Sequence, residues 1–325
     1  MIVDAHNDLL MELVHRRAEE RPFERHWLPL LERGGVGVQV CPIYTVGEEN
    51  PLREGVRAAT AFHRALAEHP GRLVQVRTAS DLDDDRLRLM LSLEGVEVLG
   101  SDPDLIDHFW QVGVRMVGLT WNARNAFADG LGAEDDRGLS ALGEELVDRL
   151  VELGVMLDLT HASPRTYEAV LDRAPVTATV LVSHAGCRGV HDHPRNLSDD
   201  QLQALAERGG VLGIMCLPLT VGSERIDGVV DHVDHVVELV GIDHVGLGGD
   251  FIRQVNRATG SEPIVGGLLP PGMASDAAVD GLEGPEGYPN LVEALRRRGY
   301  EGDRLQAVLG GNFLRLFRRG LSRKG

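Results

Sequence analysis

The stretch VMLDLTHASPRTYEAVLDRAPVTATVLVSH, residues 155–184, decides the fold. Its apolar runs at 155–160 and 179–183 predict two strands. The segment between them, 164–172, predicts a helix that begins after a capping serine, Ser163. Two strands joined by a helix lie parallel in one sheet, so this stretch predicts a strand–helix–strand unit of a parallel sheet.

The same alternation continues on both sides of this stretch. Further strands are predicted at 1–3, 35–44, 73–77, 88–93, 114–120, 211–216 and 244–247, and further helices at 9–20, 53–69, 104–112, 139–153, 199–208 and 228–240. Eight or nine such units fit a closed barrel better than an open sheet. No GxGxxG or GxxxxGK[ST] motif follows a strand, which argues against a nucleotide-binding open sheet. The predicted fold is an α/β protein, a (β/α)8 TIM-like barrel.

The length of 325 residues suits one barrel, which we predict as a single domain over residues 1–325. The segment 256–290 is rich in glycine and proline and has little periodicity, as expected of a lid or a binding loop. Two closing helices are predicted after it, at 291–298 and 303–317.

The composition is that of a soluble globular protein and excludes some partners. Lys and Arg number 33 against 50 Asp and Glu, and the net charge of −17 repels nucleic acid and anionic membrane surfaces. No run of 18 apolar residues and no signal-peptide pattern occur, so a cytoplasmic location is expected. The three cysteines show no C-x-x-C spacing, which argues against a disulfide framework and against a cysteine-based zinc site.

Acid and imidazole side chains gather at the ends of the predicted strands. In MIVDAHNDLL, residues 1–10, the strand is followed by His6 and Asp8, which share a direction because alternate strand residues point the same way. Functional groups of a (β/α)8 barrel collect at the carboxyl ends of its strands. Three histidines with carboxylates suit Zn²⁺, and one carboxylate more than a single tetrahedral ion needs suggests two ions. The other strand-end residues are Glu94, His161, His184 and Asp250.

Each of these residues has a plainer explanation when it is taken alone. Glu94 could be an exposed loop acid, His161 a neighbour of a helix cap, His184 a core histidine and Asp250 a turn residue. Their coincidence at the ends of five strands is what favours a metal site.

The sequence also resembles the membrane (renal) dipeptidase family of zinc peptidases, which includes soluble bacterial members. The likeness runs nearly end to end. It is carried by DAHNDL at 4–9, SLEG at 92–95, GVRMVGLTWNARNAFADG at 113–130, GLS at 138–140, GVMLDLTHAS at 154–163, SHAG at 183–186, PRNLSDD at 194–200, GLGGDF at 246–251, YPNLVEAL at 288–295 and GGNFLRLF at 310–317.

The resemblance implies a barrel of the metal-dependent hydrolase type that hydrolyses dipeptides with two zinc ions per chain. Matching positions assign His6 and Asp8 to one zinc ion and His161 and His184 to the other. Glu94 is implied to bridge both ions and so to belong to the catalytic centre. Two such ions would lower the pKa of a shared water and polarise the scissile carbonyl.

Two further positions are implied to handle the substrate. Arg195 matches the residue for the substrate's carboxylate, and its planar guanidinium suits a free C-terminus. Asp250 matches the residue for the amino group and for proton transfer from the attacking water to the leaving nitrogen. The segment 256–290 is expected to close over the same cavity, which would select dipeptides over longer peptides.

This chain departs from the family at two places near the site. Animal members have a substrate-contacting His where this chain has Trp121, so that contact is lost or moved to Asn122 or Arg124, and Trp121 is a predicted substrate-binding position. The second Asp of the family's GGDFDG is also replaced, since this run continues Phe251-Ile252-Arg253. We expect these changes to affect side-chain preference and turnover more than reaction class. The loop histidines His191 and His193 are predicted to be solvated.

Two other functions stay open. A related barrel amidohydrolase could act on N-acyl amino acids or other small amides with the same metals. Such enzymes usually show H-x-H on the first strand, where this chain has H-x-D. The other is a catalytically silent barrel that binds metal. The predicted partner is a small dipeptide substrate, and the resemblance suggests a homodimer.

Overall fold

The computed structural model describes residues 1–260 and 277–322. Within them, nine parallel strands form one sheet in the order β2-β1-β9-β8-β7-β6-β5-β4-β3, and pairing of β2 with β4 closes eight of them into a barrel. β3 pairs with the first residues of β4 and lies outside the ring. The predicted (β/α)8 barrel is confirmed. The strands are β1 (Ile2–Asp4), β2 (Val36–Tyr44), β3 (Leu73–Gln75), β4 (Leu87–Glu94), β5 (Val114–Gly118), β6 (Met156–Asp158), β7 (Val180–Ala185), β8 (Leu212–Ile214) and β9 (Val245–Leu247).

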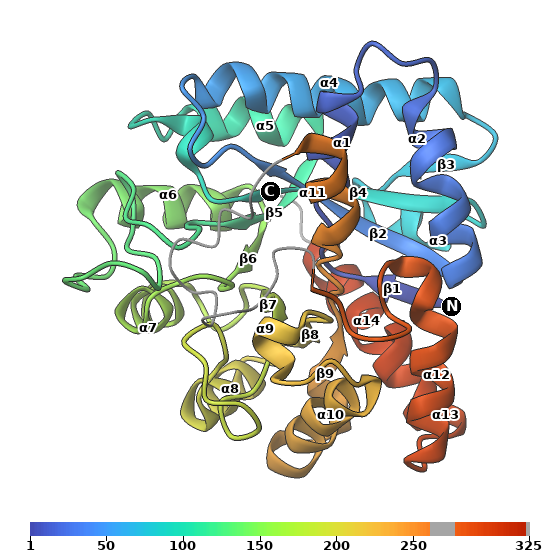
Figure 1. The fold of residues 1–325 in the computed structure, drawn as a ribbon. Coiled ribbons are helices and arrows are strands. Elements are labelled where there is room, and N and C mark those ends of the chain that lie inside the picture. The colour runs from blue at the N-terminus through green and yellow to red at the C-terminus, as the bar shows by residue number, and fades with distance from the viewer. Residues whose placement is uncertain (261–276, 323–325) are drawn as a thin grey trace.

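Helices surround the barrel (Figure 1). None of the helices in the two described ranges is both long and apolar enough to cross a membrane. The helices are α1 (Leu9–His15), α2 (Pro22–His26), α3 (Leu28–Gly34), α4 (Pro51–Glu68), α5 (Leu105–Val112), α6 (Ala141–Glu152), α7 (Pro164–Arg173), α8 (Asp199–Glu207), α9 (Pro218–Val221), α10 (Ile226–Val240), α11 (Ile252–Thr259), α12 (Tyr288–Arg297), α13 (Gly302–Gln306) and α14 (Asn312–Leu321).

Local sequence signals place the starts of α6 and α7. Ser163 is the N-cap of α7, and its hydroxyl accepts a hydrogen bond from the Thr166 backbone amide at 3.1 Å, as predicted. Ser140 caps α6 in the same way through the Gly143 amide, also at 3.1 Å. Each cap fixes where the chain turns from the carboxyl end of a strand into a helix.

Apolar side chains fill the amino-terminal half of the barrel interior and leave the other end to polar residues. Alternate strand residues point inward, among them Val38, Val40 and Met90, and all are fully buried. Phe313 and Phe317 of α14 belong to the same cluster and close that end of the barrel. The carboxyl ends of the strands are therefore the open end, where a site can form.

The first and last strands of the barrel are neighbours. Asp4 of β1 pairs with Leu247 of β9. The Asp4 carboxylate also accepts hydrogen bonds from the backbone amides of Gly249 at 2.9 Å and of His6 at 3.3 Å. One buried carboxylate thus joins the two strand ends that carry His6 and Asp250.

Several predicted segments differ from the structure. The helix predicted at 9–20 ends at His15, and α2 begins at Pro22 after a left-handed residue, Arg21 (φ 49°). A proline disfavours the helical conformation of the residue before it, so a helix cannot easily run through Arg21 into Pro22. The short helices α2 and α3 were not predicted. The closing helix predicted at 303–317 is broken by a π turn at Ala307–Gly311.

Tertiary contact explains this break. A Cβ on Gly310 would lie 2.8 Å from the Val3 side chain and 3.0 Å from its backbone nitrogen, so the helix bends where it meets β1. The predicted loop 256–290 is also shorter than expected, because α11 extends to Thr259 and α12 begins at Tyr288. Its central part, 261–276, lies outside the described residues.

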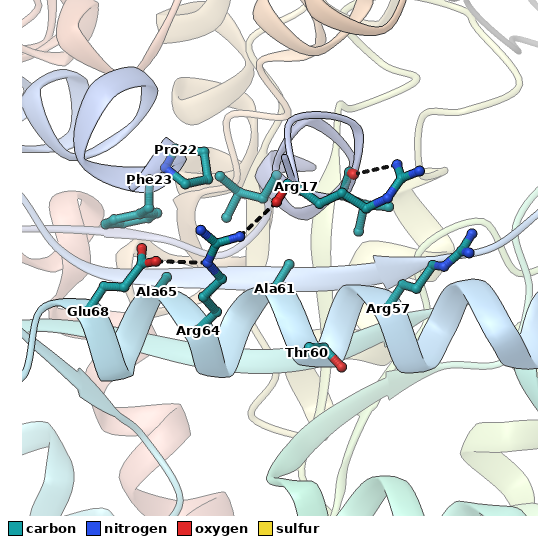
Figure 2. Close-up of a pocket in the computed structure, with 11 residues that line it drawn as sticks. Arg17, Pro22, Phe23, Arg57, Thr60, Ala61, Arg64, Ala65 and Glu68 are labelled. Atoms are coloured by element: carbon teal, nitrogen blue, oxygen red, sulfur yellow. Dashed lines mark hydrogen bonds and ion pairs between the residues drawn. The ribbon is translucent and has the colours of Figure 1, made fainter. Parts of the chain in front are cut away.

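A cavity of about 150 Å³ lies between α1, α2 and α4 (Figure 2). Its walls include Leu13, Phe23 and Ala65, and Arg64 spans it. The Arg64 guanidinium donates to Glu68 Oε1 at 2.7 Å and to the backbone carbonyl of Arg17, also at 2.7 Å. Helix residues and the loop after α1 line this cavity, so it is separate from the strand ends.

Candidate metal centre

The carboxyl ends of the strands bring the predicted site residues together. His6 and Asp8 follow β1, and Glu94 is the last residue of β4. His161 and Asp250 each lie three residues beyond a strand, β6 and β9, and His184 lies within β7. Five of these six residues are buried, and Asp8 is partly buried.

Two of these residues have a backbone conformation that side chains with a Cβ rarely adopt. His161 has φ 66° and Asp250 has φ 50°. A left-handed residue other than glycine costs on the order of 1 kcal/mol, and such residues persist where the surrounding structure holds them. Both backbones turn at the open end of the barrel, which marks it as a functional site.

The atoms around His6 are spaced for a shared cation. His6 Nε2 lies 3.8 Å from Asp8 Oδ1, 3.5 Å from Glu94 Oε2 and 3.9 Å from Asp250 Oδ1. Two ligands of one tetrahedral zinc ion lie about 3.3 Å apart, given bonds of about 2.0–2.1 Å. His6 Nε2, Asp8 Oδ1 and Glu94 Oε2 are buried without a hydrogen-bond partner, so a cation would satisfy all three.

A second group of atoms lies on the other side of Glu94. Its Oε1 is 3.0 Å from His161 Nε2 and 3.6 Å from His184 Nε2, and these two nitrogens are 3.2 Å apart. These distances also match the spacing of ligands on one ion. The His184 ring lies against the His6 ring as well, with centroids 3.7 Å apart, so the two groups of atoms adjoin.

The carboxylates around His6 favour a positive charge at this place. Burial lowers the pKa of His6, but the carboxylates of Glu94, Asp8 and Asp250 outweigh burial and raise it to about 10. Burial and the nearby Glu94 raise the pKa of Asp8. A divalent cation among these atoms would supply the charge that the carboxylates favour.

The two remaining histidines are kept neutral. Burial, together with the Arg195 guanidinium, lowers the pKa of His161 to about 3. Burial, with His6 and Arg195, lowers the pKa of His184 well below its usual value. A neutral imidazole is the form that binds a metal ion, so both rings are ready to act as ligands.

Asp250 has the properties of a proton acceptor. Burial raises its pKa to about 6, against the opposing effects of His6 and Arg195. A carboxylate with a pKa near neutrality can both take and return a proton at physiological pH. Its side chain is 9% exposed, so it lies at the edge of the buried cluster.

Arg195 is a buried cation, and among the described residues its guanidinium has hydrogen-bond donors left for a further partner. It is 4% exposed, and its Nη2 donates to the backbone carbonyl of His184 at 3.4 Å. Within residues 1–260 and 277–322 no carboxylate lies within ion-pair distance of it. Burial lowers its pKa, but an arginine stays charged, so it can bind an anion in the cavity.

The structure corrects the prediction for His193. This residue was predicted to be solvated, yet it is 6% exposed and its Nδ1 accepts a hydrogen bond from the Arg195 amide at 3.2 Å. The reason is that the loop after β7 folds back on the strand end, where the Leu197 amide donates a hydrogen bond to the Gly186 carbonyl. His191 stacks on His193 and is partly exposed.

In the loop after β5, the side chains of Asn122 and Arg124 both contact other residues of the chain. The Arg124 guanidinium binds both carboxylate oxygens of Asp129. Asn122 Oδ1 lies 2.7 Å from His161 Nδ1. The Trp121 ring lies 5.7 Å from the His161 ring and 5.7 Å, edge to face, from the Tyr44 ring, so it stands at the side of the site.

Sequence reasoning missed several residues of the site. Tyr44 is the last residue of β2, and its hydroxyl is buried without a partner. Burial and the carboxylates of Glu94 and Asp8 raise its pKa, so it stays a neutral donor. Its place at a strand end was the available signal, but the histidine and carboxylate pattern that indicates a metal site does not include a tyrosine.

A chain of hydroxyl groups holds His184 and was also missed. His184 Nδ1 lies 3.0 Å from Ser183 Oγ, which lies 3.1 Å from Thr160 Oγ1, and Thr160 donates to Asp158 Oδ1 at 2.6 Å. Asp158 and Thr160 are two residues apart on β6 and the turn after it, and Ser183 precedes His184 on β7. Only the pairing of β6 with β7 brings them together.

A closed (β/α)8 barrel whose carboxyl end buries histidines and carboxylates at ligand spacing defines a metal-binding barrel of the hydrolase class. Comparison with known proteins narrows this class. The sequence model of the membrane dipeptidase family, peptidase family M19, matches residues 1–263 and 267–323. The chain belongs to this family, as the sequence motifs predicted.

Individual relatives agree with this assignment. Dipeptidase aclJ of Aspergillus oryzae is 31% identical over 312 residues, which cover 89% of this chain and 68% of the relative. Dipeptidase 3 of Rattus norvegicus is 30% identical over 341 residues, 98% of this chain and 64% of the relative. The chain spans 57% to 68% of the length of the first three curated relatives.

Solved structures confirm the fold. A dipeptidase described as a metallopeptidase of family M19 has a TM-score of 0.86 at 23% identity, and the match covers 99% of both chains. A metallopeptidase from Rhodobacter sphaeroides, solved with a phosphinate mimic of the dipeptide L-Ala-D-Ala, has a TM-score of 0.80 at 23% identity and covers 98% of this chain and 99% of that one.

Proposed function

We propose that this protein is a zinc-dependent dipeptidase with two zinc ions per chain. His6 and Asp8 would hold one ion, His161 and His184 the other, and Glu94 would bridge them. The observation that carries this proposal is that the two carboxylate oxygens of Glu94 face different histidines. Oε2 lies 3.5 Å from His6, and Oε1 lies 3.0 Å from His161. One oxygen for each ion is the arrangement of a bridging carboxylate.

The donor set favours zinc over magnesium or calcium. Imidazole nitrogens with carboxylate oxygens are borderline ligands that suit zinc, whereas magnesium and calcium prefer oxygen alone. The family assignment supports a metal at this site, because a solved structure of the same family is described as a metallopeptidase.

Metal binding should be visible in the thermal stability of the protein. Adding Zn²⁺ to chelator-treated protein should raise the unfolding midpoint by about 5 °C or more, since a ligand that binds the folded state at high occupancy contributes several kcal/mol. Differential scanning calorimetry measures the shift. Mg²⁺ at the same concentration is the control and should raise the midpoint less. Equal midpoints with and without Zn²⁺ would count against the metal site.

In the proposed reaction, zinc ions would polarise the scissile carbonyl and acidify a water molecule. The residues of the chain supply the remaining steps. Asp250 would accept a proton from the attacking water and return it to the leaving nitrogen, for which a pKa of about 6 is suitable. While it is ionised, Asp250 would also bind the substrate's amino group.

Arg195 would hold the C-terminal carboxylate of the substrate. Its guanidinium is buried, charged and without a carboxylate partner among the described residues, so a substrate carboxylate would pair with it in a site of low polarity. This pairing selects substrates whose free C-terminus lies one residue from the scissile bond. The proposed substrate class is therefore the dipeptide.

Trp121 and Tyr44 would form one wall of the substrate pocket. Their rings meet edge to face, and the buried Tyr44 hydroxyl has no partner among the described residues. Trp121 would then contact a substrate side chain through its ring surface and not the scissile carbonyl. We propose this contact as the effect of tryptophan at this position.

The role of Arg195 can be tested with paired substrates. Arg195→Ala should raise KM for a dipeptide on the order of 10²-fold, the scale for truncating one partner of a buried charge pair, and should raise it little for the C-terminally amidated dipeptide. Steady-state kinetics with both substrates on both proteins measures this difference. Arg188→Ala is the matched control, because Arg188 lies in the same loop and is paired at the surface with Asp192.

The same assay separates the alternatives. A wild-type enzyme that cleaves amidated dipeptides or tripeptides as well as free dipeptides has no carboxylate anchor at Arg195. Hydrolysis of N-acetyl amino acids in preference to dipeptides would indicate the amidohydrolase function, and no hydrolysis with two bound ions would indicate a silent barrel. The cytoplasmic location, the homodimer and the lack of nucleic-acid binding stay predictions.

A further inference from the structure

Among the described residues, the Asn122 side chain makes one hydrogen bond, and its partner is His161. Asn122 Oδ1 and His161 Nδ1 are 2.7 Å apart, and both residues are about 5% exposed. Since an amide oxygen only accepts, His161 Nδ1 carries the proton and Nε2 carries the lone pair. That Nε2 is the atom that faces Glu94 Oε1 at 3.0 Å. The hydrogen bond therefore selects the tautomer that can bind a metal ion.

The backbone around Asn122 is built to keep this contact. The Asn122 carbonyl accepts a hydrogen bond from the Gly132 amide at 2.7 Å, and the His161 carbonyl accepts one from the Leu131 amide at 3.0 Å. A side chain at Gly130 would collide with the backbone of Trp121 and Asn122. The loop after β5 is thus docked on the segment that carries His161.

His161 needs such support more than His184 does. His184 lies within β7, and its Nδ1 is held by the hydroxyl chain that ends on the Asp158 carboxylate. His161 lies beyond its strand with a left-handed backbone, φ 66°. Among the described residues, Asn122 is the one hydrogen-bond partner of its Nδ1, and the Trp121 ring covers one side of the imidazole.

We propose that Asn122 is a positioning residue that sets the metal affinity of the ion held by His161. It acts by fixing the tautomer and the rotation of the imidazole, as hydrogen-bond partners of metal-bound histidines do in general. This inference rests on the proposed two-zinc site.

The test compares two substitutions of similar size. Asn122→Leu removes the acceptor and should lower the affinity of one of the two ions by about 10- to 100-fold while the other ion binds as in the wild type. Asn122→Asp keeps an acceptor and should bind both ions within a few-fold of the wild type or more tightly. Zn²⁺ titration against a competing chelator measures both affinities, and the Co²⁺ absorption spectrum reports the geometry of each site.

A matched control separates positioning from general loss of stability. Asn50 is an exposed residue that caps α4 by accepting a hydrogen bond from the Arg53 amide at 3.1 Å, and this bond involves none of the six strand-end residues. Asn50→Leu removes an asparagine acceptor in the same way and should leave both affinities and the Co²⁺ spectrum unchanged. Equal losses in Asn50→Leu and Asn122→Leu would overturn the proposal.

Other outcomes also decide the matter. The proposal is wrong if Asn122→Leu binds both ions as the wild type does, or if Asn122→Asp is as weak as Asn122→Leu. If Asn122→Leu does not fold, the ¹⁵N shifts of labelled histidine in the Zn²⁺-loaded wild-type protein decide, and a metal bond at His161 Nδ1 instead of Nε2 overturns the proposal. A wild type that binds fewer than two ions would instead contradict the proposed function.

Discussion

Replacing Glu94 with alanine should lower the occupancy of both metal ions at once. A ligand of one ion affects mainly that ion, but the two oxygens of Glu94 face histidines of both groups, His6 and His161. The substitution would also leave the buried cluster with one negative charge fewer to balance the cations. We expect an affinity loss of more than about 100-fold for each ion, above the range for residues that only orient ligands.

This prediction is tested by measuring the metal content after dialysis with plasma emission spectrometry. Glu97→Ala is the matched control, because Glu97 is a partly buried glutamate three residues further along that donates no atom to either group and accepts a hydrogen bond from Asn125 at 3.1 Å. That variant should retain two ions. Loss of one ion with full retention of the other in Glu94→Ala would refute the bridging role.

Replacing Asp250 with asparagine should abolish most of the turnover and spare the metals. Asparagine keeps the shape of the side chain but cannot accept a proton, so kcat should fall by about 10²-fold or more, the usual scale of general acid–base catalysis. Asp250 Oδ1 lies 3.9 Å from His6 Nε2, the longest of the three distances around His6, so binding of the ions should depend on it least.

Steady-state kinetics and metal content on the same preparation test this prediction. Asp243→Asn is the matched control, since Asp243 is an exposed residue just before β9 and its substitution should change neither quantity. Turnover near the wild-type value in Asp250→Asn would remove Asp250 from the mechanism. Loss of an ion in that variant would instead make Asp250 a metal ligand.

The barrel and the metal-site candidates could be read from the sequence because both depend on local patterns. Alternating strands and helices require only neighbouring residues, and His6, Glu94 and His184 stand at or near strand ends that those patterns locate. A barrel then brings all strand ends to one face without further information. The structure places these residues within hydrogen-bond or ion-pair distance of one another, and their assignment as zinc ligands remains a proposal.

What could not be predicted depends on contacts between distant segments. The break at Gly310 exists because α14 meets β1, and the burial of His193 depends on how a loop folds back on β7. Asn122 meets His161 across 39 residues, and no short-range pattern encodes that distance. Arg195 was assigned by resemblance alone, because an arginine in a polar loop gives no local sign of burial. The single-domain assignment over 1–325 stays a prediction.

The bond between Asp4 and the Gly249 amide has a consequence for how the protein is made. These residues are 245 positions apart, and β1 has β2 on one side and β9 on the other. During synthesis β1 therefore has an unpaired edge until β9 has left the ribosome. His6 and Asp8 emerge long before Asp250, which can join them only after β9. Assembly of the proposed site is thus completed only after β9, and a nascent chain that stalls before residue 245 has an open sheet edge where Asp250 would join His6.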